Sequence, residues 1–538
     1  MKESFVAIFI LLLITAAGLY IRLDAVAEPI WLDECHTAWT VDADTAVEVA
    51  DRAADGNQPP LYFWLVWLAT QGFGLSELSL RIVSIVSGMG LLVTATWFAK
   101  VLTDRWSAAV LVAGLIAFDG QFIYYASEAR SYALVQLLGL VQAVAFWCTL
   151  KVNGRALNSE WQGASRRFVA IEPAASALPL IFTRLALPVW TILSALLLYC
   201  HYTSVWIIAA EVLMMICVSI KQKAFPTGFT VASVLVAASL IPRFWNVSMV
   251  FARRSNWGPV SSRARLWTDV EPWLVHWLLI PVGFLLAAWL VRMASQSSER
   301  RKENQLPNWL LNTWLLVWAI SGPLGIAMVD WMQIAPMALL RYSAVCWVAM
   351  ALFAANCLRL YSPRMSWVVA IAILLSSFFG NWWASELVSD QKLPTFRGED
   401  WVTTVSQISD SDSDQPVFQL ADVIEDIDSL TITDKRFNDY LQFPLRGANA
   451  VSEQDLISNG RQLFVIPTWS VEFTQQHLEA IREADGCWLV VRGDLDYAVI
   501  VPGILEKYLK ESIEFRLLPN EQMPFDKVHL IRVRTLGD

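Results

Sequence analysis

Charged side chains are scarce in this chain. Asp, Glu, Lys and Arg make up 17% of its 538 residues, against 56% hydrophobic residues. Soluble domains carry about 25% charged residues, so the composition excludes an ordinary soluble protein. The mean hydropathy of +0.45 and the 27 tryptophans indicate a polytopic membrane protein. The net charge of -9 arises from acidic residues that are concentrated after residue 385, so the preceding part is not acidic.

Paired cysteines are also absent. The seven cysteines lie mostly inside apolar runs, and no two of them form a CxxC motif. This pattern excludes a disulfide framework and a structural zinc site. The sequence after residue 385 lacks a Gly-rich phosphate loop, a catalytic-triad spacing and a metal-binding cluster, so we interpret it as a capping or partner-binding part. No internal repeat of convincing period is present.

The chain instead has apolar runs long enough to cross a bilayer, which takes about 20 mostly apolar residues. The first run continues without a small-x-small cleavage site, so we interpret it as an uncleaved span and not a signal peptide. Residues 58–75 are apolar but too short after Pro59 and Pro60, and we assign them to a juxtamembrane helix. The eleven predicted spans are 4–21, 80–100, 107–124, 130–150, 184–201, 203–220, 227–244, 272–292, 308–329, 338–360 and 366–384.

Lys and Arg in the short loops set the orientation of the chain. With the N-terminus inside, the basic clusters near 100–105, 151–167, 221–223, 292–302 and 359–364 all face the cytoplasm. An odd number of spans then places the C-terminal part outside. The sequence therefore predicts an integral protein of the cytoplasmic (inner or plasma) membrane with an extracytoplasmic C-terminal domain.

Residues 385–538 differ in character from residues 1–384. Charges become frequent, and the Ser/Asp run at 410–416 is typical of a loop. Short β-like runs alternate with helical patterns, which favours a soluble α/β domain. These runs are 462–467, 487–491 and 528–533 for strands, with helices near 472–484 and 503–511. The expected fold is a mainly α membrane domain over 1–384, followed by this α/β domain over 385–538.

The motif WLDECH, which begins at Trp31, holds two adjacent carboxylates shortly after the first predicted span. In the predicted topology it lies on the outer face. A carboxylate flanked by tryptophans, Asp33 here, is a candidate general base toward a hydroxyl group. Its neighbour Glu34 is then available to hold the acceptor or a cation. The alternative is a pair of solvated surface carboxylates with no chemical role.

Four arginines stand at the ends of predicted spans, on the side that the positive-inside rule disfavours: Arg22, Arg81, Arg130 and Arg341. A single arginine at a helix end often only reaches toward lipid headgroups. A guanidinium stays charged and binds phosphate oxygens in bidentate fashion. Four such residues together with a carboxylate therefore indicate transfer of a group from a lipid-linked phosphate.

The order of six motifs resembles the GT-C fold glycosyltransferases, in particular the branch of the protein O-mannosyltransferases (glycosyltransferase family 39) and the lipid A aminoarabinose transferases. The motifs are WLDE, QPPLYFW, LSLRIVS, YYASEARSYALVQLL, CHYTS and LLRYS, and the resemblance covers about residues 1–384. It implies a polyprenyl-phosphate sugar donor, a lipid, glycan or protein acceptor, and inversion at the anomeric carbon. It also implies that Asp33 is the base and that Arg22 and Arg81 contact the lipid phosphate, while Arg130 belongs to the ARSYAL segment.

The chain departs from the pattern of this group at Gln58, where many relatives carry a histidine. Glu34, Gln58 and His201 are predicted to bind the donor or acceptor sugar, although a lone histidine at a helix end is often only hydrogen-bonded. Asp42 and Asp44 form a DxD pattern, but the donor implied by the resemblance is not a nucleotide sugar. A divalent metal is neither required nor assigned, and no nucleic-acid partner is expected.

Two other functions stay open. A transporter or flippase of a lipid-linked or anionic substrate also needs many spans and intramembrane arginines. A membrane anchor for the C-terminal domain needs only one span and leaves the arginines unexplained. Release of polyprenyl phosphate from a labelled donor distinguishes the transferase from the transporter.

Overall fold

The computed structural model of the protein describes residues 2–161, 180–222, 226–253, 309–335, 340–380, 393, 395, 397–411, 413–421, 435–447, 461–467, 471–518 and 527–536. The chain forms two compact units, each made of two segments. Unit 1 comprises Met1–Asp24 and Ser84–Thr395, and unit 2 comprises Ala25–Val83 and Phe396–Asp538. The domain boundary predicted at residue 384 rests on the change in composition, and it stays a prediction.

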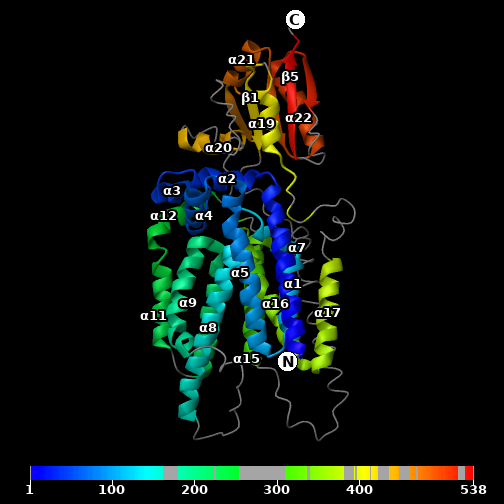
Figure 1. The fold of residues 1–538 in the computed structure, drawn as a ribbon. Coiled ribbons are helices and arrows are strands. Elements are labelled where there is room, and N and C mark those ends of the chain that lie inside the picture. The colour runs from blue at the N-terminus through cyan, green and yellow to red at the C-terminus, as the bar shows by residue number, and fades with distance from the viewer. Residues whose placement is uncertain are drawn as a thin grey trace. The chain divides into compact units, whose positions relative to one another are not determined.

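Unit 1 is a bundle of helices, most of which run alongside one another in Figure 1. Its longer helices are α1 (Lys2–Asp24), α5 (Glu77–Thr103), which begins in unit 2, α6 (Trp106–Phe118), α7 (Gly120–Ala126), α8 (Tyr132–Trp161), α9 (Leu180–Cys200), α10 (Val205–Gln222), α11 (Thr227–Ala238), α12 (Phe244–Ala252), α15 (Trp309–Trp331), α16 (Trp347–Cys357) and α17 (Pro363–Gly380). Short 3-10 helices are η2 (Tyr202–Ser204), η3 (Ile241–Arg243), η7 (Leu340–Cys346) and η8 (Leu358–Leu360).

Many of these helices are suited to a membrane. Seven of the described helical segments are long and apolar enough to span it, and α6 with α7 forms an eighth if this pair, bent by 61°, counts as one. Two shorter apolar helices cover Leu185–Cys200 and Pro363–Phe379. Together these segments account for every predicted span except 272–292, which lies outside the described residues. The chain is therefore an integral membrane protein, as predicted.

Small residues allow the central helices of unit 1 to pack closely, as is common between membrane helices. The whole of α16 is buried, and so is α6 from Ser107 to Ala117. A Cβ added at Gly114 of α6 would lie 2.5 Å from the Leu374 side chain of α17, so a larger residue there would require Leu374 to shift. By contrast, α1 exposes large apolar residues such as Phe5 and Leu12 along its length, which suits a lipid-facing helix.

Unit 2 contains helices from both of its segments and one sheet. The segment 25–83 supplies η1 (Ala25–Ala27), α2 (Leu32–Val41), α3 (Ala46–Asp55) and α4 (Leu61–Phe73). The C-terminal segment supplies α19 (Trp401–Ser409), α20 (Lys435–Gly447), α21 (Gln475–Glu483) and α22 (Leu495–Leu509). With 13 residues, α4 is the helix expected within 58–75 and is too short for a span.

The sheet has five strands in the order β2-β1-β3-β5-β4. Strand β1 pairs in parallel with β2 and β3, whereas β5 pairs antiparallel with β3 and β4. Three of the strands coincide with the predicted runs at 462–467, 487–491 and 528–533. The bounds are β1 (Val417–Ala421), β2 (Leu463–Pro467), β3 (Gly486–Arg492), β4 (Ile513–Leu518) and β5 (Val528–Thr535).

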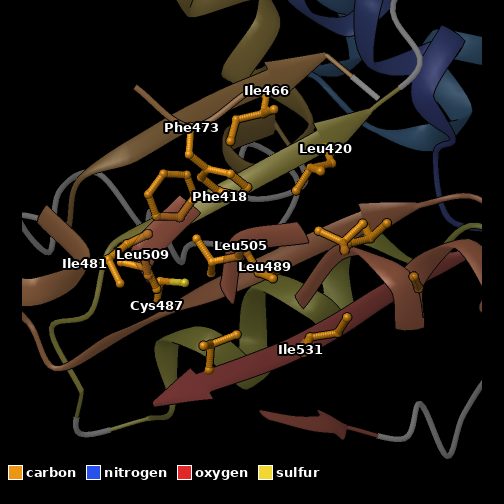
Figure 2. Close-up of a cluster of buried hydrophobic side chains, with 14 of the residues drawn as sticks. Phe418, Leu420, Ile466, Phe473, Ile481, Cys487, Leu489, Leu505, Leu509 and Ile531 are labelled. Atoms are coloured by element: carbon orange, nitrogen blue, oxygen red, sulfur yellow. The ribbon is translucent and has the colours of Figure 1, made fainter. Parts of the chain in front are cut away.

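The core of this sheet domain is apolar and continuous. Side chains of β1, β3 and β5 pack with the buried faces of α21 and α22, including Ile481 and Leu505 (Figure 2). Phe418 of β1 stacks on Phe464 of β2 with ring centroids 5.0 Å apart. Strands β1 and β3 lie inside the sheet and are buried, whereas the edge strand β2 is only partly buried. This confirms the predicted α/β character of the C-terminal part.

Candidate functional site

Asp33 lies in the first turn of α2, and Trp31 is the N-cap residue of this helix. Asp33 is half-buried, whereas Glu34 is completely buried. The Trp31 carbonyl accepts hydrogen bonds from the amides of Glu34 (2.8 Å) and Cys35 (2.9 Å). The Trp31 amide in turn donates to Glu34 Oε2 at 3.3 Å. The carboxylate predicted to be the base is therefore the more accessible of the pair.

Glu34 forms a buried ion pair with Arg81 of α5, and both residues belong to unit 2. Arg81 Nε donates to Glu34 Oε1 at 2.8 Å, and Nη2 donates to Oε2. The same guanidinium donates to the carbonyls of Glu28 (2.7 Å) and Pro29 (3.0 Å). Four of its five N–H groups are thus used by the protein itself. The predicted role of Arg81 at a lipid phosphate stays a prediction, and the ion pair gives it a structural role in addition.

A second buried carboxylate, Glu399, also contacts the first turn of α2. Glu399 Oε2 accepts hydrogen bonds from the Leu32 amide at 3.0 Å and from Trp401 Nε1 at 3.1 Å. Its Oε1 faces Arg492, the last residue of β3, at 2.8 Å from Nε and 2.7 Å from Nη2. Glu399 and Arg492 are not predictable from the sequence, because no local pattern connects residues so far apart in the chain.

The carboxylates around the first turn of α2 also affect the thiol of Cys35. Burial raises the pKa of the Cys35 thiol well above its ordinary value, and the carboxylates of Glu399, Glu34 and Asp33 raise it further. Arg492 acts in the opposite direction. The three carboxylates therefore lie around the start of one helix, where the helix dipole and two arginines compensate them.

The DxD pattern lines an open cavity of about 210 Å³ in unit 2. Asp42 and Asp44 are both exposed there, and Thr70 and Gln71 of α4 complete its polar wall. Within the described part of the chain, no three His, Cys, Asp or Glu side chains gather as a metal site. Gln58 is half-buried just before α4, and its backbone N–H donates to the Ala53 carbonyl at 2.8 Å.

In unit 1, Arg22 is buried at the bend between α6 and α7. Its Nη2 donates to the carbonyl of Ile116 at 2.8 Å, and Nη1 donates to Ala117 at 3.4 Å and to Gly18 at 2.9 Å. Beyond the bend, Asp119 Oδ1 accepts from the first amides of α7. The last carbonyls of a helix lack partners within it, so Arg22 satisfies groups that the bend exposes. Its predicted contact with a lipid phosphate stays a prediction.

Arg130, His201 and Arg341 converge in unit 1, although they lie far apart in the sequence. Each stands at the start of an apolar segment, next to Tyr132–Leu150, Tyr202–Ile220 and Arg341–Leu360 respectively. Both arginines interact electrostatically with His201, which is buried. His201 Nδ1 lies 2.7 Å from the hydroxyl oxygen of Thr203. Both arginines are only half-buried, in contrast to Arg22 and Arg81.

Aromatic side chains lie beside His201 and Arg341. The ring centroid of His201 lies 5.5 Å from that of Tyr132 and 6.0 Å from that of Tyr342. The Arg341 guanidinium carbon lies 5.6 Å from the ring centroid of Tyr342. Tyr125 lies 4.8 Å from Tyr132, and the buried carboxylate of Glu128 interacts electrostatically with both of these tyrosines.

The structure thus gathers the predicted site residues into separate groups. Unit 1 brings Arg130, Arg341 and His201 together, and it holds Arg22 at the α6–α7 bend. Unit 2 brings together Asp33, Glu34 and Arg81, with Gln58 elsewhere in the same segment. The motif YYASEARSYAL contains the tyrosines of this group, but only its arginine was predicted as a site residue.

In unit 1, Arg130 and Arg341 carry two positive charges against the one negative charge of Glu128. The tyrosine rings nearby add apolar surface. Such a group can bind an anion that carries an apolar tail.

The fold of the whole chain is that of the GT-C membrane proteins. The crystal structure of ArnT from Cupriavidus metallidurans in the apo state matches it with a TM-score of 0.55, at 10% identity, over 97% of each chain. ArnT from the same organism bound to undecaprenyl phosphate matches with a TM-score of 0.50, at 12% identity, over 97% of each chain. The oligosaccharyltransferase of Archaeoglobus fulgidus in the apo form aligns with a TM-score of 0.47 at 10% identity, over 91% of this chain and 70% of that one.

The resemblance expected from the order of the motifs is therefore confirmed at the level of the fold. No family model matches the chain, and no curated protein matches it either.

Proposed function

We propose that this protein transfers a sugar from a polyprenyl-phosphate donor to an acceptor hydroxyl on the extracytoplasmic face of the membrane, with inversion of the anomeric carbon. The observation that carries the proposal is the convergence of Arg130 and Arg341 with His201 at the starts of three apolar segments. A phosphate at the membrane surface is the ligand that such a group suits best. The fold adds support, because ArnT shares it and one of its structures holds undecaprenyl phosphate.

In the proposed reaction, the acceptor oxygen attacks the anomeric carbon while the bond from that carbon to the phosphate oxygen breaks. The proton of the acceptor hydroxyl moves to the Asp33 carboxylate, and the electron pair of the broken bond leaves with the polyprenyl phosphate. Arg130 and Arg341 stabilise the charge of this leaving group. Glu34, already paired with Arg81, is the less suitable base.

The test is release of polyprenyl phosphate from a labelled polyprenyl-phosphate sugar by the full chain in lipid nanodiscs. Loss of one charge-assisted hydrogen bond costs about 1.5–3 kcal/mol, so Arg341→Gln and Arg130→Gln are each expected to raise the donor KM about 10- to 100-fold. Arg364→Gln is the matched control, since Arg364 is exposed at the start of α17 in the same unit. Asp33→Asn is expected to abolish transfer, and full activity of this variant would refute its role as the base.

A transporter or flippase is the second candidate, and one observation favours it. The α6–α7 pair is a helix broken by 61° with Arg22 and Asp119 at the break, and broken helices with charged groups are typical of transporters. Movement of labelled donor across the bilayer without release of polyprenyl phosphate would establish this function in place of the transferase.

A further inference from the structure

We infer that the C-terminal domain has a positioning role: Glu399, held by Arg492 of its sheet, fixes the first turn of α2 and thereby the carboxylate of Asp33. The inference rests on the proposed function in so far as Asp33 is the base. All of these residues belong to unit 2. Glu399 is a positioning residue, since it contacts the backbone next to Asp33 and not the substrate.

The start of α2 needs a partner from elsewhere in the chain. The first amides of a helix have no acceptor within the helix; a side-chain oxygen at the N-cap usually accepts from the second or third of them, and the first needs a partner from elsewhere. The N-cap residue here is Trp31, whose indole has a donor and no acceptor. The Leu32 amide is instead satisfied by Glu399 Oε2 at 3.0 Å.

Glu399 is itself held firmly. Its side chain is buried, with 1% of its surface exposed. Trp401 Nε1 donates to Oε2 at 3.1 Å, and Arg492 donates to Oε1 from two nitrogens at 2.8 and 2.7 Å. The preceding residue Gly398 has φ +72°, which favours glycine, and its carbonyl accepts from the Lys527 amide at 2.6 Å. The carboxylate therefore connects the sheet to α2 through fixed contacts.

Asp33 directly follows Leu32, so the position of its carboxylate depends on this contact. A catalytic group displaced by about 1 Å can lower a rate about 100-fold. Arg492 compensates the charge of Glu399, because an unpaired carboxylate would be costly in this buried place. Residues 396–538 thereby contribute to the reaction without supplying a catalytic group.

The experiment measures kcat and donor KM for variants of the full chain in nanodiscs. Glu399→Leu/Arg492→Met removes the acceptor and both charges, and we expect kcat to fall about 100-fold with little change in KM. Glu399→Gln/Arg492→Met keeps a neutral carbonyl oxygen for Leu32 and Trp401, and we expect it to recover kcat to within about fivefold of the wild type. The second variant separates the hydrogen bond from the ion pair.

The matched control is the exposed ion pair of Arg482 and Glu511 in the same domain, with a distance of 2.8 Å and side chains 39% and 32% exposed. Arg482→Met/Glu511→Gln is expected to leave kcat unchanged. Equal losses in the control and in Glu399→Leu/Arg492→Met would indicate general damage to the domain and overturn the inference. Failure of Glu399→Gln/Arg492→Met to recover kcat beyond Glu399→Leu/Arg492→Met would overturn it as well.

A second readout does not depend on transferase activity. Amide hydrogen exchange at Leu32 is slow only while Glu399 accepts its hydrogen bond, because the helix offers no other partner. We expect exchange at this amide to be at least about tenfold faster in Glu399→Leu/Arg492→Met than in the wild type, and close to wild type in the Gln-containing variant. Unchanged exchange refutes the positioning contact even if the protein proves to be a transporter. Faster exchange in a protein without transfer activity leaves the contact established and refutes only the proposed reaction.

Discussion

The buried ion pair of Glu34 and Arg81 allows the role of Arg81 to be decided by a double-mutant cycle. Arg81→Met leaves the carboxylate of Glu34 buried without its cation. Breaking a buried ion pair in this way costs about 3–5 kcal/mol. For a folding unit of roughly 200 residues, each kcal/mol lowers the apparent melting temperature by about 2–4 °C, so we expect a fall on the order of 10 °C.

The double variant Glu34→Gln/Arg81→Met removes both charges. The carbonyls of Glu28 and Pro29 then lose a donor, and this loss costs about 1–2 kcal/mol. We therefore expect the double variant to regain more than half of the lost melting temperature. The assay is thermal unfolding of the full chain in nanodiscs, followed by the fluorescence of its tryptophans. A double variant no more stable than Arg81→Met would show that the ion pair has no energetic coupling and refute this reasoning.

The same double variant tests whether Arg81 also contacts the donor phosphate. Since Glu34 and two carbonyls already use four of its N–H groups, we expect the donor KM of the stable double variant to stay within about threefold of wild type. A KM raised about tenfold or more would indicate a lost phosphate contact, as the family resemblance implies. Arg482→Met, which breaks an exposed ion pair in the same unit, is the control and is expected to cost less than about 1 kcal/mol.

Three further predictions concern packing and pH. A Cβ added at Gly88 would lie 2.4 Å from Ala126 Cβ, so Gly88→Ala is expected to cost about 1–3 kcal/mol in thermal unfolding, and an unchanged melting temperature would contradict this close approach. Arg22→Met takes the donor from the Ile116 carbonyl, which should cost about 1–3 kcal/mol, with partial recovery in Arg22→Lys and none expected in a leucine variant. Burial lowers the pKa of His477, so the unfolded state takes up its proton first and stability should fall as pH decreases below about 6.5; His477→Gln should lessen this fall between pH 7 and 5, as measured by melting temperature.

The parts of the fold that the sequence predicted are those with a strong apolar signal. The membrane helices and the strands β2, β3 and β5 all contain apolar runs. Strand β4 was missed because its apolar signal is weak: Ile513 and Leu517 pack against the core but are only partly buried, and Glu514 to Arg516 between them are exposed. Strand β1 is buried but only five residues long, and it follows a Ser/Asp run that reads as loop.

The sequence indicates candidate site residues one by one, but it does not indicate how they group in the fold. Arg130 and Arg341 stood out because cations at the ends of apolar spans are unusual. Their convergence with His201 depends on helix packing, which residue spacing does not give. Glu399 was not predictable, because its contact with Leu32 joins residues 367 positions apart. One glutamate among the frequent charges of the C-terminal part also gives no distinct pattern.

Burial separates the four arginines into two kinds. Arg22 and Arg81 are 0% and 1% exposed, and a guanidinium removed from water so completely must be compensated by protein groups. Both are, by backbone carbonyls and by Glu34. Arg130 and Arg341 are only half-buried, so part of each side chain is accessible to a ligand.

The same criterion applies to the two adjacent carboxylates. Glu34 is fully buried and forms an ion pair with Arg81. A general base must reach the substrate hydroxyl and accept its proton. Half-buried Asp33 meets the first requirement better than the fully buried Glu34.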